Sequence, residues 1–221
     1  MSLETNKNLG GIGAILILIS VFAVFFFSYL GILALVGLIM ILVSLHGLAD
    51  YYKDGKIFTH ALYGFIAEIV GVAAAFVALF YIVFDTSILT DFLYKIYPGW
   101  NGSWASLPGM TATTSGIGYS DVAPVLGAIA LVGVIFWVFT IVSTILDRQS
   151  FKALSMKSNV GLFSTGALLL VIGAVLTVIL IGFVLLWVGT LLLAIAFFRL
   201  KPQMEQQFTA TSGPPVTPTP V

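Results

Sequence analysis

Two apolar stretches, each about twice as long as a transmembrane helix needs to be, constrain this chain more than any other feature. They cover residues 9–48 and 160–198. A helix that crosses a bilayer needs about 20 apolar residues, so each stretch is long enough for two crossings joined by a tight turn. We place these turns at residues 28–31 and 181–182, where each apolar stretch is locally broken.

Two further apolar segments separate the stretches, and the composition supports the same class of protein. Only 8% of the residues are charged, against roughly 25% in soluble globular proteins. We therefore predict an all-α, polytopic integral membrane protein with about six transmembrane helices in a single membrane domain, residues 1–201. The predicted spans are residues 9–27, 30–48, 61–84, 122–146, 160–180 and 182–198.

The basic residues predict the orientation of these spans. With six spans and the N-terminus inside, eight of the nine Lys and Arg residues lie in inner segments and only Lys95 lies outside. Such an excess of basic residues is typical of cytoplasmic segments, so both termini are expected in the cytoplasm. The first apolar run lacks a small-residue cleavage site, and we interpret it as a retained span rather than a signal peptide.

The segments outside the predicted spans have distinct compositions. The outer loop, residues 85–121, carries tyrosines and tryptophans suited to the membrane interface. Asn101 begins an Asn-Gly-Ser tripeptide on the outer side and is a candidate glycosylation site. The Thr- and Pro-rich residues 202–221 are expected to form a disordered cytoplasmic tail.

Glu68 is the one acid well inside a predicted span, roughly 10 Å from the inner end of its helix at 1.5 Å per residue. His46 lies at a similar predicted depth in the preceding span and is its most plausible partner. The pair could form a proton-linked or cation-binding site, because an intramembrane carboxylate is costly. The alternative is an interhelical hydrogen bond that only holds two helices together.

A segment of the outer loop resembles the selectivity filter of potassium channels, in which backbone carbonyls replace the hydration shell of the ion. The matching string is Gly-Ile-Gly-Tyr-Ser-Asp-Val-Ala-Pro, and the candidate filter residues are Gly116, Ile117, Gly118, Tyr119 and Ser120. Gly116 replaces the filter threonine, and Ser120 replaces a glycine at which a positive φ is needed. A loop rich in Gly, Ser and Thr can also produce this match by composition alone.

A faint internal repeat links the two long apolar stretches. Asn8-Leu9-Gly10 with Gly13-Ala14 is echoed by Asn159-Val160-Gly161 with Gly166-Ala167. A duplicated helical hairpin would explain the echo, and so would the frequent use of Asn and Gly at the start of membrane helices. Glycines along these helices also predict close helix packing, within the chain or between copies.

The two hairpins resemble an uncharacterised family of mainly archaeal membrane proteins, the domain-of-unknown-function family nine-nine-six. The resemblance rests on three segments and covers roughly residues 5–201. They are Lys7-Asn8-Leu9-Gly10-Gly11-Ile12-Gly13-Ala14, Asp50-Tyr51-Tyr52-Lys53 with Ile57-Phe58, and Ile181-Gly182-Phe183 with Gly189 and Ala196-Phe197-Phe198. The resemblance implies an archaeal plasma membrane protein and supplies no catalytic or binding residues.

The sequence favours a non-catalytic membrane protein, such as a structural or accessory subunit of a larger assembly. There is no cysteine, and no nucleophile set, carboxylate pair or metal-ligand cluster shares one depth. We therefore expect no enzymatic activity, cofactor, metal or nucleic-acid partner. The expected partners are membrane lipids and other membrane subunits or a second copy, and the alternative is a small transporter or cation channel.

Overall fold

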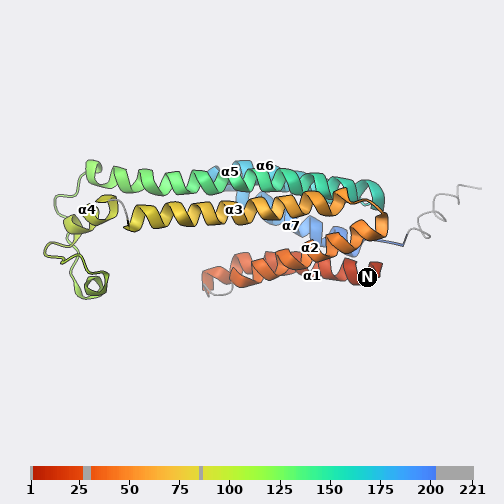
Figure 1. Cartoon of the computed structure of the whole chain (residues 1–221), viewed down its shortest axis with the longest axis horizontal. Coiled ribbons are helices and arrows are strands. Elements are labelled where there is room, and N and C mark those ends of the chain that lie inside the picture. The colour runs from red at the N-terminus through yellow and green to blue at the C-terminus, as the bar shows by residue number, and fades with distance from the viewer. Residues whose placement is uncertain (1, 27–30, 85–86, 203–221) are drawn as a thin grey trace, which may run out of the picture. The chain divides into compact units, whose positions relative to one another are not determined.

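The computed structural model describes residues 2–26, 31–84 and 87–202, with the side chains of residues 22–26 left aside, and these residues form helices and connecting turns without a strand (Figure 1). Most described residues of each predicted span lie in one or two of these helices. The elements are α1 (Leu3–Phe26), α2 (Ile32–Tyr52), α3 (Lys56–Phe84), α4 (Ser87–Ile96), η2 (Trp104–Gly109), α5 (Tyr119–Ser158), α6 (Leu162–Leu176), η3 (Thr177–Ile179) and α7 (Ile181–Phe198).

Five helical segments are long and apolar enough to cross a membrane, as in a polytopic membrane protein. They are α2, α3, α5, the continuous segment Leu162–Ile179 formed by α6 and η3, and α7. The 24-residue α1 holds the remaining predicted span. The count of six spans and the cytoplasmic placement of both termini stay predictions, and the expected tail at residues 203–221 lies outside the described residues.

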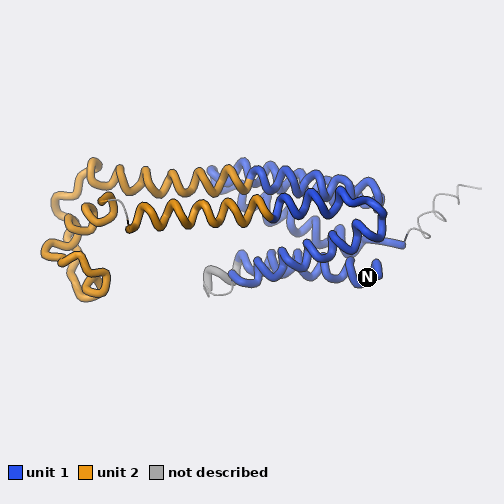
Figure 2. Tube along the Cα trace, viewed as in Figure 1, with its two compact units in different colours: residues 1–65, 141–221 blue, residues 66–140 orange. Residues whose placement is uncertain are grey.

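The chain divides into two compact units, drawn in different colours in Figure 2. Unit 1 comprises residues 1–65 and 141–221, and unit 2 comprises residues 66–140. Helices α3 and α5 contribute residues to both units. The sequence does not predict this division, and the single membrane domain expected for residues 1–201 stays a prediction.

Each long apolar stretch forms a helical hairpin in unit 1 whose helices meet at glycines. A Cβ atom added at Gly13 of α1 would lie 2.6 Å from the carbonyl oxygen of Gly37 in α2. In the second hairpin, a Cβ at Gly166 of α6 would lie 3.1 Å from the carbonyl oxygen of Gly189 in α7. A close glycine contact therefore joins the two helices of each hairpin, and the origin of the faint internal repeat stays open.

The turn of the second hairpin consists of a single residue. Helix η3 ends at Ile179 and α7 begins at Ile181, so Leu180 alone makes the connection. Its φ of 61° is in the left-handed region, which is uncommon for a residue other than glycine. The predicted break at residues 181–182 is therefore displaced by one residue, and the corresponding break at residues 28–30 lies outside the described residues.

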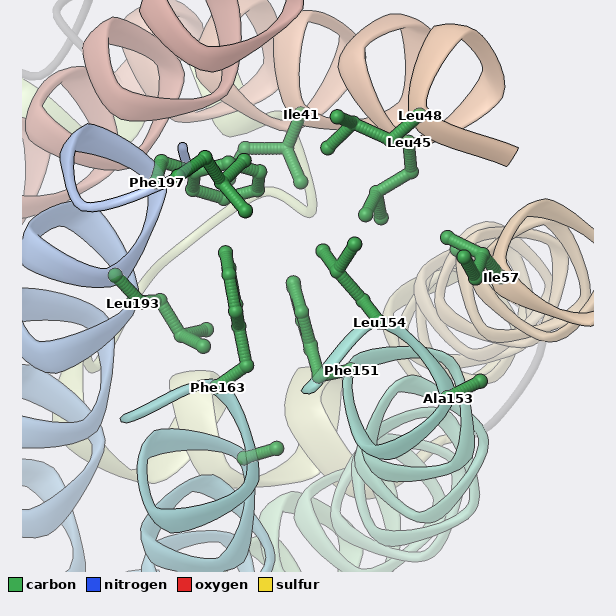
Figure 3. Packing of buried hydrophobic residues seen from close by; sticks show 14 of the residues in the cluster. Ile41, Leu45, Leu48, Ile57, Phe151, Ala153, Leu154, Phe163, Leu193 and Phe197 are labelled. Atoms are coloured by element: carbon green, nitrogen blue, oxygen red, sulfur yellow. The ribbon is translucent and has the colours of Figure 1, made fainter. Parts of the chain in front are cut away.

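Aromatic side chains at one end of the hairpins form the centre of the unit 1 core (Figure 3). Phe151 of α5 and Phe163 of α6 are stacked with ring centroids 6.0 Å apart. The edge of Phe197 from α7 meets Phe163 at a centroid distance of 5.1 Å. Phe163 and Phe197 are fully buried, so this cluster joins α5, α6 and α7 in one apolar core.

The helices extend further than the predicted spans at their inner ends. Helix α3 begins at Lys56 rather than at residue 61, and α5 continues to Ser158, beyond the predicted end of its span at residue 146. A polar sequence can continue a helix when one face packs, and here Phe151 and Leu154 are buried. The outer loop also contains structure that the sequence did not predict, namely α4 and η2.

Candidate functional site

The two residues of the predicted intramembrane pair lie in different units. His46 of α2 belongs to unit 1, and its side chain is 60% exposed, with Nε2 3.9 Å from an Asp50 carboxylate oxygen. Its ring also meets Phe58 edge to face at a centroid distance of 4.6 Å. Glu68 of α3 belongs to unit 2 and is half-buried. A functional pairing of the two residues therefore stays a prediction.

The filter-like segment forms the N-terminus of α5. Gly116 has a φ of 89°, and Tyr119 is the first residue of the helix with its side chain 82% exposed. The Gly118 N–H donates to an Asp121 carboxylate oxygen over 3.0 Å, and the Asp121 N–H donates to the Gly118 carbonyl over 3.1 Å. These reciprocal bonds cap the helix, and an ion filter at residues 116–120 stays a prediction.

The cap is reinforced by a cation from α4. The Lys95 ammonium donates to the Asp121 carboxylate, and both residues lie in the segment 85–121 that is predicted to be an outer loop. This hydrogen bond, followed by the one from the Gly118 N–H, lowers the pKa of Asp121 below its ordinary value. Lys95 is the basic residue that the predicted topology leaves outside, and the structure gives it a local role in holding α4 near the start of α5.

The outer aromatic residues form a connected cluster. Trp100 lies 5.0 Å from Tyr94 and 5.7 Å from Trp104, measured between ring centroids. The Trp100 indole N–H donates to the Ser103 carbonyl over 2.7 Å. Asn101 is exposed beside this cluster, and its side-chain oxygen accepts from the Ser103 N–H over 2.9 Å. The site is accessible, and its glycosylation stays a prediction.

Buried polar groups in unit 1 are the polar contacts that sequence reasoning missed. Asn6 of α1 is fully buried, and its amide lies against Gly47 of α2. The Ser44 hydroxyl donates to the Asn6 carbonyl over 2.7 Å, and the Ser150 hydroxyl of α5 donates to the Ile57 carbonyl of α3. These hydrogen bonds connect neighbouring helices. In the sequence, the only signal of these polar residues is that few polar residues occur in or beside the apolar runs.

Two glycines of α5 differ from the glycines in the other long helices. Every glycine within α1, α2, α3, α6 and α7 has neighbouring atoms within 4 Å of the position of an added Cβ. For Gly127 and Gly133 of α5, no atom of the described residues lies within that distance. Ala130 is three residues from each of them and is exposed. The spacing places the three small residues along one ridge of the helix, and the sequence analysis did not single them out.

The part of the chain that the structure describes contains no cluster of potential metal ligands. There, no three His, Cys, Asp or Glu side chains gather closely enough to hold an ion. The absence of a metal, a cofactor and a catalytic set for the whole chain stays a prediction. The features with a distinct geometry are therefore the open small-residue ridge of α5, the capped start of α5 and the buried polar contacts of unit 1.

Comparison with known proteins identifies a family but no activity. The family model described as protein of unknown function (DUF996) matches residues 33–191, which is most of the chain. An uncharacterised protein of Methanocaldococcus jannaschii is 26% identical over 208 residues, which cover 94% of this chain and 98% of the relative. No solved structure matches. The family resemblance read from the two hairpins is thereby confirmed, and the chain belongs to the DUF996 family of proteins of unknown function.

Proposed function

We propose that this protein is a non-catalytic structural or accessory subunit of a membrane assembly, and that the small-residue ridge of α5 contacts the partner. The ridge comprises Gly127, Ala130 and Gly133. The observation that carries the proposal is the open space at both glycines, where nothing lies within 4 Å of an added Cβ. In membranes, small residues gather where the backbones of two helices approach closely.

The surroundings of the ridge support the same proposal. Within unit 2, no residue at positions 72–84 of α3 or 129–140 of α5 is buried. Lipid can cover exposed apolar side chains, because lipid tails are as apolar as leucine. A helical glycine, however, gains nothing from contact with lipid and lowers the stability of a helix by about 0.5–1 kcal/mol relative to alanine. Two exposed glycines on one ridge are better explained by a partner helix, from another subunit or from a second copy.

The proposed assembly lies in the plasma membrane with both termini of the subunit in the cytoplasm. Support for this orientation comes from the basic residues, eight of nine of which fall in predicted inner segments. Support for a plasma membrane comes from the archaeal relative, which matches nearly the full length of this chain.

Copurification from native membranes tests the proposal. The tagged full-length protein is extracted in a mild detergent, and its companions are measured by native electrophoresis and quantitative mass spectrometry. A Gly127→Leu/Gly133→Leu variant is expected to lose a stoichiometric companion or its own second copy, because leucine side chains would hold the partner backbone away. Ala73→Leu provides a matched control, since Ala73 is exposed on α3 in the same unit.

The stability of the variant in detergent is measured in parallel. Because open space surrounds both glycines, the monomer should keep its fold. A wild-type protein that runs only as a monomer, or a glycine variant that keeps its companion as fully as the Ala73→Leu control, would contradict the proposal.

A further inference from the structure

We propose that unit 1 contains a binding pocket for the phosphate group of an anionic phospholipid, at the end where α1 and α6 begin and α7 ends. The pocket has a volume of about 660 Å³, which is within the range of small-molecule sites, about 300–1,000 Å³. Its walls include Lys7 from the start of α1, Gly161 and Leu162 from the start of α6, and Phe198, Arg199 and Lys201 from the end of α7.

The charged groups of the pocket are all basic. Three cations, Lys7, Arg199 and Lys201, line it from segments far apart in the sequence, and none of the described residues that line it is acidic. Of the three cations, Lys7 forms an ion pair with Glu4, whose carboxylate oxygen lies 3.1 Å from the Lys7 ammonium. Arg199 and Lys201 are exposed and have no ion-pair partner among the residues that the structure describes. The pocket therefore keeps an uncompensated positive charge.

The start of α6 adds a second feature that favours an anion. The N-cap residue Gly161 has no side chain, so no side-chain cap satisfies the first N–H groups of this 15-residue helix. Of these groups, the Phe163 N–H already donates to the Val160 carbonyl over 3.3 Å. The other N–H groups of the first turn lie at the positive end of the helix dipole. Asn159, which lies between α5 and α6, has a φ of 56°, and it lines the pocket together with Gly161 and Leu162 at the start of α6. A phosphate oxygen would accept hydrogen bonds from these N–H groups.

The pocket joins its basic rim to an apolar wall. Leu162 and Phe198 line it beside the three cations, and they lie at the ends of predicted spans. The site is therefore at the level where lipid headgroups meet acyl chains. A soluble phosphate would use only the basic rim, whereas a phospholipid would use both surfaces. Basic pockets between helices at the cytoplasmic side of a membrane are typical binding places for anionic headgroups.

Native mass spectrometry of the purified full-length protein in a neutral detergent tests this inference. The probes are dioleoyl phosphatidylglycerol, dioleoyl phosphatidylcholine and inorganic phosphate. We expect the wild-type protein to bind phosphatidylglycerol at least tenfold more tightly than either other probe. Arg199→Gln/Lys201→Gln should weaken this binding about tenfold or more, because each basic residue near an anionic lipid surface contributes roughly a factor of five.

Arg148→Gln/Lys152→Gln is the matched control. It removes one arginine and one lysine that are exposed on α5 and do not line the pocket. Both variants thus lose the same charge, and only the pocket variant should lose tight binding. Equal losses in the two variants would indicate a general surface attraction and overturn the proposal. Equal binding of phosphatidylcholine, or equally tight binding of inorganic phosphate, would also overturn it.

A second pair of variants separates binding from folding. A Cβ added at Gly161 meets nothing within 4 Å, so Gly161→Asp and Gly161→Asn can both be accommodated. Aspartate and asparagine at an N-cap stabilise a helix to similar extents, but only aspartate repels a phosphate. Gly161→Asp should lose phosphatidylglycerol binding about tenfold relative to Gly161→Asn, while the thermal stabilities of the two lipid-free variants agree. Equal lipid binding by the two variants would refute a phosphate at the start of α6.

Discussion

The contact between Gly13 and Gly37 allows a quantitative test of how α1 and α2 are held together. In a Gly13→Ala variant, the added methyl carbon would lie 2.6 Å from the Gly37 carbonyl oxygen, 3.0 Å from the Met40 Cβ and 3.1 Å from the Ile41 Cγ1. Ordinary van der Waals contact begins at 3.4 Å. The nearest atom belongs to the backbone of a helix and cannot rotate away, so the two helices must separate locally.

The expected cost follows from this overlap. Overpacking of a well-packed contact destabilises a protein by about 1–3 kcal/mol. Replacing a helical glycine by alanine returns about 0.5–1 kcal/mol through the lower conformational entropy of the unfolded chain. Because the overlapping atom is backbone at 2.6 Å, we expect a cost in the upper part of this range, about 2–3 kcal/mol, so that Gly13→Ala lowers the free energy of unfolding by about 1–2.5 kcal/mol. The equivalent change in the second hairpin, Gly166→Ala, should cost less than about 1 kcal/mol, because its nearest atom is 3.1 Å away.

Unfolding of the detergent-solubilised monomer by increasing mole fractions of sodium dodecyl sulfate, followed by circular dichroism, measures these differences. Gly133→Ala is the matched control, because Gly133 also lies inside a long helix but has nothing within 4 Å of its added Cβ. The control should be as stable as the wild-type protein or slightly more stable. If Gly13→Ala unfolds at the same detergent fraction as Gly133→Ala, the close contact between α1 and α2 does not exist and the argument is refuted.

Two further predictions concern polar groups. Asn6 is fully buried, and its side-chain amide has no hydrogen-bond partner among the described residues. Because a buried unsatisfied polar group costs about 1–3 kcal/mol, Asn6→Leu should raise the free energy of unfolding in the same assay. A lower free energy of unfolding would contradict this prediction. Lys95→Gln should raise the pKa of Asp121 toward 3.8, because the Lys95 hydrogen bond is the largest cause of its depression. The stabilisation from this contact is present at neutral pH and is lost as the pH falls through the depressed pKa. Carbon-13 NMR titration of the carboxylates measures the pKa of Asp121. An unchanged pKa in the Lys95→Gln variant would show that Lys95 does not act on Asp121.

The arrangement of the helices along the chain could be predicted well, but their ends could not. The apolar residues of α7 coincide with the predicted span 182–198 to within one residue. By contrast, α5 runs to Ser158, well beyond the predicted end of its span at residue 146. Hydropathy identifies the part of a helix that suits a bilayer, and it carries no information on helices that continue into water or into a packed core. Burial of Phe151 and Leu154 decides the extension of α5.

The candidate sites divide in the same way. Sequence alone singled out Glu68 as an intramembrane acid and Asn101 as an exposed tripeptide, because both signals are local. It could not indicate that Gly127 and Gly133 lack neighbours, since burial depends on which helix faces which. From the sequence, Lys7, Arg199 and Lys201 indicate only the orientation of the spans. Their meeting in one pocket depends on the end of α7 lying beside the starts of α1 and α6.

The amino-acid sequence by itself determined that this chain is helical and suited to a membrane, and it also indicated the family. The physical reason is that a bilayer requires each crossing segment to satisfy its own backbone hydrogen bonds, so long apolar runs form helices whatever surrounds them. Only the tertiary structure decided the glycine contacts of the two hairpins, the burial of Asn6 and the basic pocket of unit 1. Each of these joins residues far apart in the chain, and proximity of that kind arises from side-chain packing rather than from any local pattern.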